Sequence, residues 1–201
     1  MTKENNEFIK QYLNETGLLI EGLDSRQILK VAEEIVSVFR KHGTVFVFGN
    51  GGSASTASHF AADLSKNTVV DLSSDAEKRF RVVCLNDNIP LMAALANDLG
   101  FEHVFSQQLM GLAQEEDLVI AISGSGNSPN ILRALEVAKK KKCRVAALLG
   151  FNGGKALKLA DSFVLVNSGN YAKVESIHLL LEHLLCSLVM LSLGKKNKFF
   201  P

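Results

Sequence analysis

The sequence has almost no net charge and very little cysteine. Among its 201 residues, 22 lysines and arginines stand against 21 aspartates and glutamates, which leaves a formal net charge of +1. Proteins that bind nucleic acid usually carry a strong basic excess, so this balance argues against a general polyanion binder. The three cysteines, Cys84, Cys143 and Cys186, are scattered along the chain. Such usage predicts reduced thiols, with neither a disulfide framework nor a zinc-knuckle spacing.

The sequence also lacks a long uninterrupted apolar run. Its first ten residues, MTKENNEFIK, do not contain the apolar core of a signal peptide. The longest apolar run, near 177–193, is broken by His178, Glu182 and His183, which argues against a membrane span. We therefore expect a cytoplasmic protein that has neither a membrane nor a nucleic acid as its partner.

Short apolar runs alternate with helical patterns along the chain. Five β-branched or apolar runs, each ending in a turn signal, predict strands at 44–48, 81–85, 118–123, 144–149 and 162–166. Helix-period spacing of apolar residues covers 4–16, 25–42, 53–66, 89–112, 129–141, 154–160 and 172–193. Continuous apolar strands that alternate with helices indicate a parallel sheet covered on both faces.

The sequence thus predicts an α/β fold, a three-layer αβα sandwich with a five-stranded parallel sheet of the flavodoxin-like kind. No long linker, repeat or low-complexity tract interrupts this pattern. We expect a single domain over 1–201, in which N-terminal helices at 4–42 precede a sandwich core at 43–193.

Two turns rich in glycine and serine follow the first and third predicted strands. They read Gly-Asn-Gly-Gly-Ser at 49–53 and Ser-Gly-Ser-Gly-Asn-Ser at 123–128. Glycines let backbone amides approach an anion, serine hydroxyls add donors, and the following helix presents its positive end. The sequence therefore predicts a phosphate site built by five serines: Ser53, Ser55, Ser123, Ser125 and Ser128. Because neither turn matches the dinucleotide or P-loop motifs, nucleotides are poorly supported ligands.

These motifs occur in a characteristic order: GNGGSAS, HFA, ANDLGFEHVFSQQL, ISGSGNSPNIL and LLGFNGGKAL. In combination they resemble the sugar isomerase (SIS) domain, and more closely the phosphoheptose isomerases, which interconvert sedoheptulose 7-phosphate and a heptose 7-phosphate. The resemblance runs from about residue 5 to residue 193. It implies a homotetramer with the N-terminal helix in the subunit interface, and sites between subunits that often hold zinc.

The resemblance carries over to particular residues. The family's substrate-binding positions correspond here to Asn50, Gly51, Gly52, Ser53, Asn97, Asp98, Ser123, Gly124, Ser125 and Ser128. Its functional histidine and glutamate correspond to His59 and Asp63, and the glutamine and histidine of its last helix to Glu175 and His183. This chain departs from the family at several substrate-facing positions. Gly124 replaces a threonine, Asn67 an arginine and Ala172 an aspartate.

Helical spacing supports a joint role for the histidines and carboxylates. His59 and Asp63 are four residues apart and share one helix face, while Glu175 and His183 differ by about 80° around their helix. Imidazoles and carboxylates from two helices make a plausible zinc site, with His59, Asp63, Glu175 and His183 as the expected ligands. His178 fits better as a structural residue.

Aldose–ketose isomerisation moves a proton between C1 and C2 through an enediol and needs a base, an acid and stabilisation of the enediolate. We expect Glu175 or Asp63 to be the base on carbon, with Glu175 favoured, and His183 to move protons between oxygens. Glu175 is also expected to contact substrate. Three alternatives remain open: a non-catalytic SIS adaptor that binds a protein such as a replication initiator, a sugar-phosphate sensor, and an isomerase of another sugar phosphate.

Overall fold

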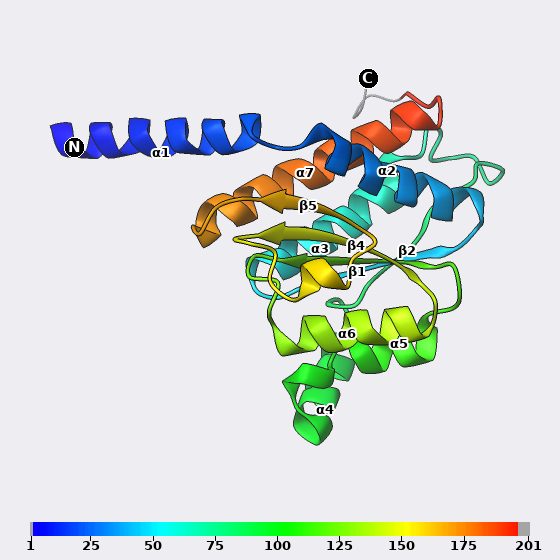
Figure 1. Cartoon of the computed structure of the whole chain (residues 1–201). Coiled ribbons are helices and arrows are strands. Elements are labelled where there is room, and N and C mark those ends of the chain that lie inside the picture. The colour runs from blue at the N-terminus through cyan, green and yellow to red at the C-terminus, as the bar shows by residue number, and fades with distance from the viewer. Residues whose placement is uncertain (1, 197–201) are drawn as a thin grey trace.

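The computed structural model describes residues 2–196 and contains one five-stranded parallel sheet (Figure 1). The strands are β1 (Thr44–Gly49), β2 (Arg81–Cys84), β3 (Leu118–Ser123), β4 (Arg144–Gly150) and β5 (Ser162–Val166). Their order in the sheet is β2-β1-β3-β4-β5, and all four neighbouring pairs are parallel. The predicted α/β sandwich is confirmed, and the carboxyl ends of β1 and β3 lie side by side at one edge of the sheet.

Helices cover both faces of the sheet. The α-helices of the described residues are α1 (Lys3–Glu21), α2 (Ser25–Arg40), α3 (Gly52–Ala62), α4 (Ile89–Leu99), α5 (Ser106–Leu112), α6 (Pro129–Lys140) and α7 (Tyr171–Ser192). Side chains alternate along each strand, so Val45 and Val47 pack toward α2, α3 and α7, whereas Phe46 and Phe48 pack toward α5 and α6. Both faces of the sheet are therefore buried in separate apolar cores, beneath the helices seen on either side of the sheet in Figure 1.

Two expected helices differ from the prediction. The helix predicted over 89–112 is divided into α4, a 3₁₀ turn at Phe101–His103, and α5. The division falls at Gly100, whose φ of 96° lies in a region that favours glycine. The helix predicted over 154–160 is only a 3₁₀ turn at Ala156–Lys158. In both cases a helical pattern of apolar residues is overridden by local backbone geometry.

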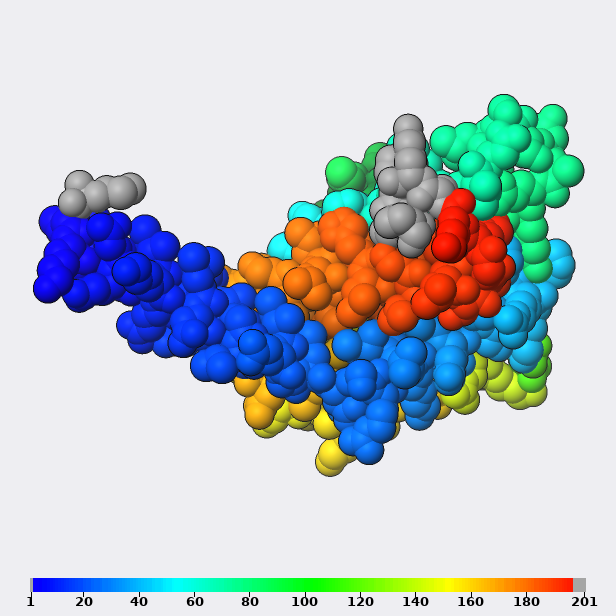
Figure 2. Space-filling model, turned by 90° about the horizontal axis from the view of Figure 1, so that it is seen from above, coloured from blue at the N-terminus to red at the C-terminus, as the bar shows by residue number. Residues whose placement is uncertain are grey.

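Helix α1 projects away from the sandwich, as both whole-molecule views show (Figures 1 and 2). It has no buried residue, and large apolar side chains such as Phe8 and Leu13 are about two-thirds exposed, at 66% and 65%. Glu15 on α1 forms an ion pair with the buried Lys173 of α7. Lys173, although buried on α7, is thus paired with a carboxylate of α1.

Helix α7 is long and apolar enough to cross a membrane by length and composition. Half of its most apolar window is buried inside the protein, where Ile177, Leu181 and Leu185 pack in the same core as α2 and α3. Its burial therefore agrees with its being a core helix.

Candidate active site

A small polar pocket lies at the carboxyl ends of β1 and β3. Seven of the residues expected to bind substrate line it, namely Asn50, Ser53, Ser123, Gly124, Ser125, Ser128 and Glu175. Two further lining residues, Ile122 and Tyr171, had not been singled out from the sequence. The cavity measures about 80 Å³, whereas pockets for whole drug-sized ligands usually span roughly 300–1,000 Å³. It therefore suits one small group, such as a phosphate.

Glycines allow the first turn to fold tightly at the start of α3. Gly51 has a φ of 56°, and a Cβ added to Gly49 would lie 2.6 Å from the carbonyl oxygen of Ser53. The side-chain amides of Asn50 and Asn130 exchange two hydrogen bonds of 2.9 and 2.8 Å, which tie the turn to α6. The turn is thus held in place before any ligand binds.

The second turn keeps its hydroxyl hydrogens available for a ligand. The Oγ atoms of Ser123 and Ser125 accept hydrogen bonds from the backbone amides of Gly126 (3.1 Å) and Asn127 (3.3 Å). A hydroxyl that accepts can still donate its own hydrogen. Ser128 caps α6 without a side-chain bond to the helix, and the unpaired amides of that helix end also favour an anion.

Four ionisable side chains from α3, the turn after it and α7 form a cluster. They are His59, Asp63, Glu182 and His183, and one potential ligand atom from each lies within 4.8 Å of the others. The rings of His59 and His183 meet edge to face with their centroids 4.9 Å apart. The sequence prediction that these two histidines converge is thereby matched within a single chain.

Glu182 lies between the two histidines of the cluster. Its Oε1 is 3.5 Å from His59 Nδ1 and 3.3 Å from His183 Nε2, yet it has no hydrogen-bond partner among the described residues. The Glu182 side chain is fully buried, while the two histidine side chains are about half exposed. Burial, and then the negative charge of Asp63, raise the pKa of Glu182 to about 8.

Asp63 is positioned by a π-helical turn. The α-helical hydrogen-bond pattern of α3 ends at Ala62 and gives way to a π-helical turn over Asp63–Asn67. Such turns are rare in proteins overall, and those that occur are often found at functional sites. Asn67 Nδ2 donates to Asp63 Oδ1 at 2.7 Å, and Asp63 Oδ2 is 3.7 Å from His183 Nε2. Asn67, where the family has an arginine, thus holds one oxygen of the Asp63 carboxylate.

Glu175 does not belong to this cluster, contrary to the expected ligand set. It lines the pocket at the start of α7, and a Cβ added to Gly52 would overlap its carboxylate. Glu175 and His183 are eight residues apart, which is about 12 Å along a helix axis, so their angular separation alone was misleading. Glu182, the neighbour of His183, takes the expected place of Glu175. The sequence feature that could have identified Glu182 as a site residue is its carboxylate in an otherwise apolar helix.

Other residues predicted from the sequence lie outside both the serine-lined pocket and the histidine–carboxylate cluster. Gly51 and Gly52 shape the first turn without lining the pocket, and the exposed Ser55 does not line it either. Asn97 and Asp98 hydrogen-bond to each other on α4, which has no buried residue. They do not line the pocket of their own chain.

His178 is fully buried on α7, and neither ring nitrogen has a partner with hydrogen-bond geometry among the described residues. Burial lowers its pKa to about 4, against a weaker opposing effect of the Leu149 backbone. The imidazole is therefore neutral near neutral pH, which agrees with the structural role expected for it.

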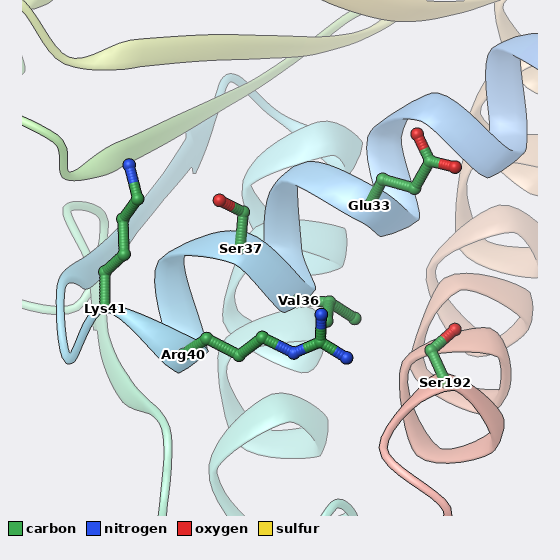
Figure 3. Close-up of a pocket in the computed structure, with 6 residues that line it drawn as sticks. All are labelled: Glu33, Val36, Ser37, Arg40, Lys41 and Ser192. Atoms are coloured by element: carbon green, nitrogen blue, oxygen red, sulfur yellow. The ribbon is translucent and has the colours of Figure 1, made fainter.

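A second hollow, of about 440 Å³, lies between α2 and the end of α7. Figure 3 shows Arg40, Glu33 and Ser192 around it, contributed by these two helices. It is at the amino ends of the strands, whereas ligands in open α/β sheets bind beyond the carboxyl ends. The smaller serine-lined pocket is therefore the better candidate despite its size.

The cluster is suited to a divalent metal ion. Imidazole nitrogens and carboxylate oxygens are the ligands that zinc takes in catalytic sites. A buried carboxylate oxygen without a hydrogen bond is costly unless a charge compensates for it, and Glu182 Oε1 is in that position. The donor set and its unpartnered oxygen thus fit zinc.

Comparison with known proteins agrees with this geometry. Residues 11–150 match the family model of the SIS domain. The phosphoheptose isomerase 1 of Campylobacter jejuni is 39% identical over 81% of this chain and 85% of its own length. The chain belongs to the phosphoheptose isomerase family of SIS domain proteins.

Further members of the family cover nearly the whole chain. The phosphoheptose isomerase of Helicobacter pylori is 33% identical over 94% of this chain and 96% of its own length. The structure of the phosphoheptose isomerase from Neisseria gonorrhoeae superposes with a TM-score of 0.83 at 29% identity, covering 92% of this chain and 97% of that one. The similarity thus includes both helices, α3 and α7, that carry the cluster.

Proposed function

We propose that this chain is an aldose–ketose isomerase that interconverts sedoheptulose 7-phosphate and D-glycero-D-manno-heptose 7-phosphate, or a closely related sugar phosphate. One observation carries the proposal: the serine-lined pocket and the histidine–carboxylate cluster share α3 and α7. An anion pocket and an acid–base group on the same pair of helices can hold a phosphate ester and act on its distant carbons.

The spacing along these helices supports a seven-carbon substrate. From Ser53 to His59 is six residues, about 9 Å of α3, and from Glu175 to His183 is eight residues, about 12 Å of α7. In an extended heptulose 7-phosphate, seven bonds separate phosphorus from C2, which is about 9 Å at roughly 1.25 Å per bond. Shorter sugars place C2 nearer the phosphate. We therefore expect turnover to fall from heptulose to pentulose phosphates.

In this proposal Asp63 is the base that takes the proton from carbon. Its Oδ1 accepts from Asn67, which leaves Oδ2, on the side of His183, for the substrate. His183 moves the proton between the C1 and C2 oxygens. Glu175, which had been favoured as the base, is assigned instead to hydroxyl groups of the substrate near the phosphate. The serine hydroxyls and backbone amides fix the phosphate and so position the carbon chain.

Zinc is part of the proposal. It was expected on His59, Asp63, Glu175 and His183, and the cluster replaces Glu175 by Glu182. When bound, zinc would polarise the substrate oxygens and stabilise the enediolate charge.

We also propose a homotetramer with sites at subunit interfaces, formed by a single domain in which N-terminal helices at 4–42 join a sandwich core at 43–193. The exposed apolar side chains of α1 support this, because a helix with such a surface is usually covered. Asn97 and Asp98, remote from their own pocket, would then serve a neighbouring chain. Analytical ultracentrifugation tests the assembly, and a sedimenting mass of one chain would contradict it.

The protein is proposed to act in the cytoplasm. Its three cysteines are free and buried, as expected in a reducing compartment. Cell fractionation with an antibody to the protein tests this, and recovery with the membrane fraction would count against it.

The activity is tested by a coupled assay of the purified protein against C5, C6 and C7 ketose phosphates, with and without zinc. We expect the highest kcat/KM with sedoheptulose 7-phosphate. Absence of turnover on every sugar, together with tight binding to a protein partner, would favour the non-catalytic adaptor instead.

Tyr171 fills the space left by Gly124, and this predicts a specific coupling. A Cβ at Gly124 would lie 2.9 Å from two ring carbons of Tyr171, whose ring packs against Phe151 at 4.7 Å. We expect Gly124→Ala to displace the ring and raise KM about tenfold, the equivalent of about 1.4 kcal/mol. Tyr171→Ala should restore much of the affinity in the double variant. If the double variant has the same KM as Gly124→Ala, the two positions do not interact.

A further inference from the structure

We infer that Glu182 is a direct ligand of a divalent metal ion together with His59 and His183, and that Asp63 stays outside the ligand set as the proton acceptor. This assignment differs from the expected set in both carboxylates. The role of Asp63 as proton acceptor rests on the proposed function, whereas metal binding by Glu182 can be measured without any substrate.

Distances within the cluster favour these three donors. Ligands of a tetrahedral zinc at about 2.0–2.1 Å are separated from each other by about 3.3 Å. Glu182 Oε1 lies 3.5 Å from His59 Nδ1 and 3.3 Å from His183 Nε2. The distances from Asp63 are longer: 3.8 Å from Oδ1 to Nε2, the other ring nitrogen of His59, and 3.7 Å from Oδ2 to His183 Nε2. Glu182 and the histidines are therefore already near the spacing of a shared ion.

Burial gives a second, independent reason. The Glu182 side chain has no exposed surface, and its Oε1 has no hydrogen-bond partner among residues 2–196. Its neighbours on the buried face of α7 include Leu181 and Leu185, which cannot compensate a charge. Leaving such a carboxylate uncompensated costs several kcal/mol. A dication bound by Oε1 would supply the missing partner, and both histidines that flank this oxygen are neutral donors when they ligate.

Asp63 has a hydrogen-bond donor that Glu182 Oε1 lacks. Asn67 already donates to its Oδ1 at 2.7 Å, whereas Glu182 Oε1 accepts from no described group. Catalytic zinc sites commonly have three protein ligands and one open position. His59 and His183 are 45% and 47% exposed, so solvent or a substrate oxygen can reach that side of the cluster. Two histidines and Glu182 complete a site that still leaves room for substrate.

Zinc binding to the chelator-stripped protein tests the assignment. Competition with a chromophoric chelator is measured for the wild type, Glu182→Gln, Asp63→Asn and Glu175→Gln. We expect one zinc per chain, with affinity lowered at least about 100-fold in Glu182→Gln, at the top of the range known for outer-shell partners. Asp63→Asn and Glu175→Gln should stay within about tenfold of the wild type. A loss in Asp63→Asn or Glu175→Gln as large as in Glu182→Gln would overturn the assignment.

Two further measurements remain decisive if Glu182→Gln folds poorly. The thermal midpoint of each metal-free variant reports folding, and a crystal of the zinc-loaded wild type needs no variant at all. Anomalous scattering at the zinc edge should place the ion about 2.0–2.2 Å from a Glu182 oxygen. An ion bound to Glu175, or to Asp63 with Glu182 remote, would refute the inference. If the wild type binds zinc through Glu182 but turns over no sugar phosphate, only the proposed function fails.

Discussion

Replacing His183 by alanine is expected to lower kcat for sedoheptulose 7-phosphate by at least about 100-fold, the scale of a positioned acid–base group. His183 Nε2 lies 3.7 Å from Asp63 Oδ2 and 3.3 Å from Glu182 Oε1, so its loss removes a donor from the centre of the cluster. KM should change much less, because His183 does not line the serine-lined pocket that is proposed to hold the phosphate. Steady-state kinetics in the presence of zinc measure both constants, and the zinc content of the variant is measured alongside because His183 is also an inferred metal ligand.

The control for this experiment is His42→Asn. His42 lies before β1, at the opposite end of the sheet from the pocket, and its φ of 60° is one that asparagine tolerates. This variant should keep wild-type kinetics. A His183→Ala enzyme that retains more than about a tenth of wild-type kcat would remove His183 from the chemical step, since positioned acid–base groups contribute more than that.

His178 is expected to make the protein markedly less stable in acid. Its pKa is about 4 in the folded protein, lowered from 6.5 by burial. Because the folded pKa is depressed, the unfolded chain binds the proton more readily, and stability falls as pH falls. The contribution is fully present above pH 6.5 and is lost progressively down to about pH 4. A shift of this size corresponds to about 3 kcal/mol of the free energy of unfolding.

Urea unfolding of the metal-free protein between pH 4 and pH 8 tests this, at one protein concentration because assembly also affects stability. His178→Leu should be much less sensitive to acid over that window. At pH 7 it should unfold at similar or higher urea, because neither ring nitrogen of His178 has a hydrogen bond to lose. His42→Asn should follow the wild-type curve. Parallel curves for the wild type and His178→Leu would show that His178 does not control acid stability.

Much of the site could be predicted because it depends on local sequence. The two turns follow strands that are recognisable as apolar runs, and glycine and serine determine what those turns can bind. His59 and Asp63 share one helix face by spacing alone. Neither the strand order β2-β1-β3-β4-β5 nor the convergence of α3 with α7 can be deduced from any single segment. The convergence was expected because of the resemblance to known isomerases.

The expected and observed arrangements differ at positions where tertiary packing decides. Angular position on α7 suggested Glu175, but a rise of about 12 Å over eight residues separates it from His183. Glu182 could not be assigned because a carboxylate in an apolar helix can equally be a subunit contact or a buried pair. The π-helical turn at Asp63–Asn67, which orients Asp63, has no sequence pattern of its own. Likewise, the ring of Tyr171 beside Gly124 is visible only once β3 and α7 are brought together.

The sequence by itself determined the sandwich and the two turns rich in glycine and serine, because strand length, apolar periodicity and glycine are local properties of the chain. The pairing of His59 with His183 was expected only from the resemblance. Only the tertiary structure decided which carboxylate joins those histidines. That choice depends on distance between helices and on burial, and both arise when α3 and α7 pack together and exclude water from Glu182.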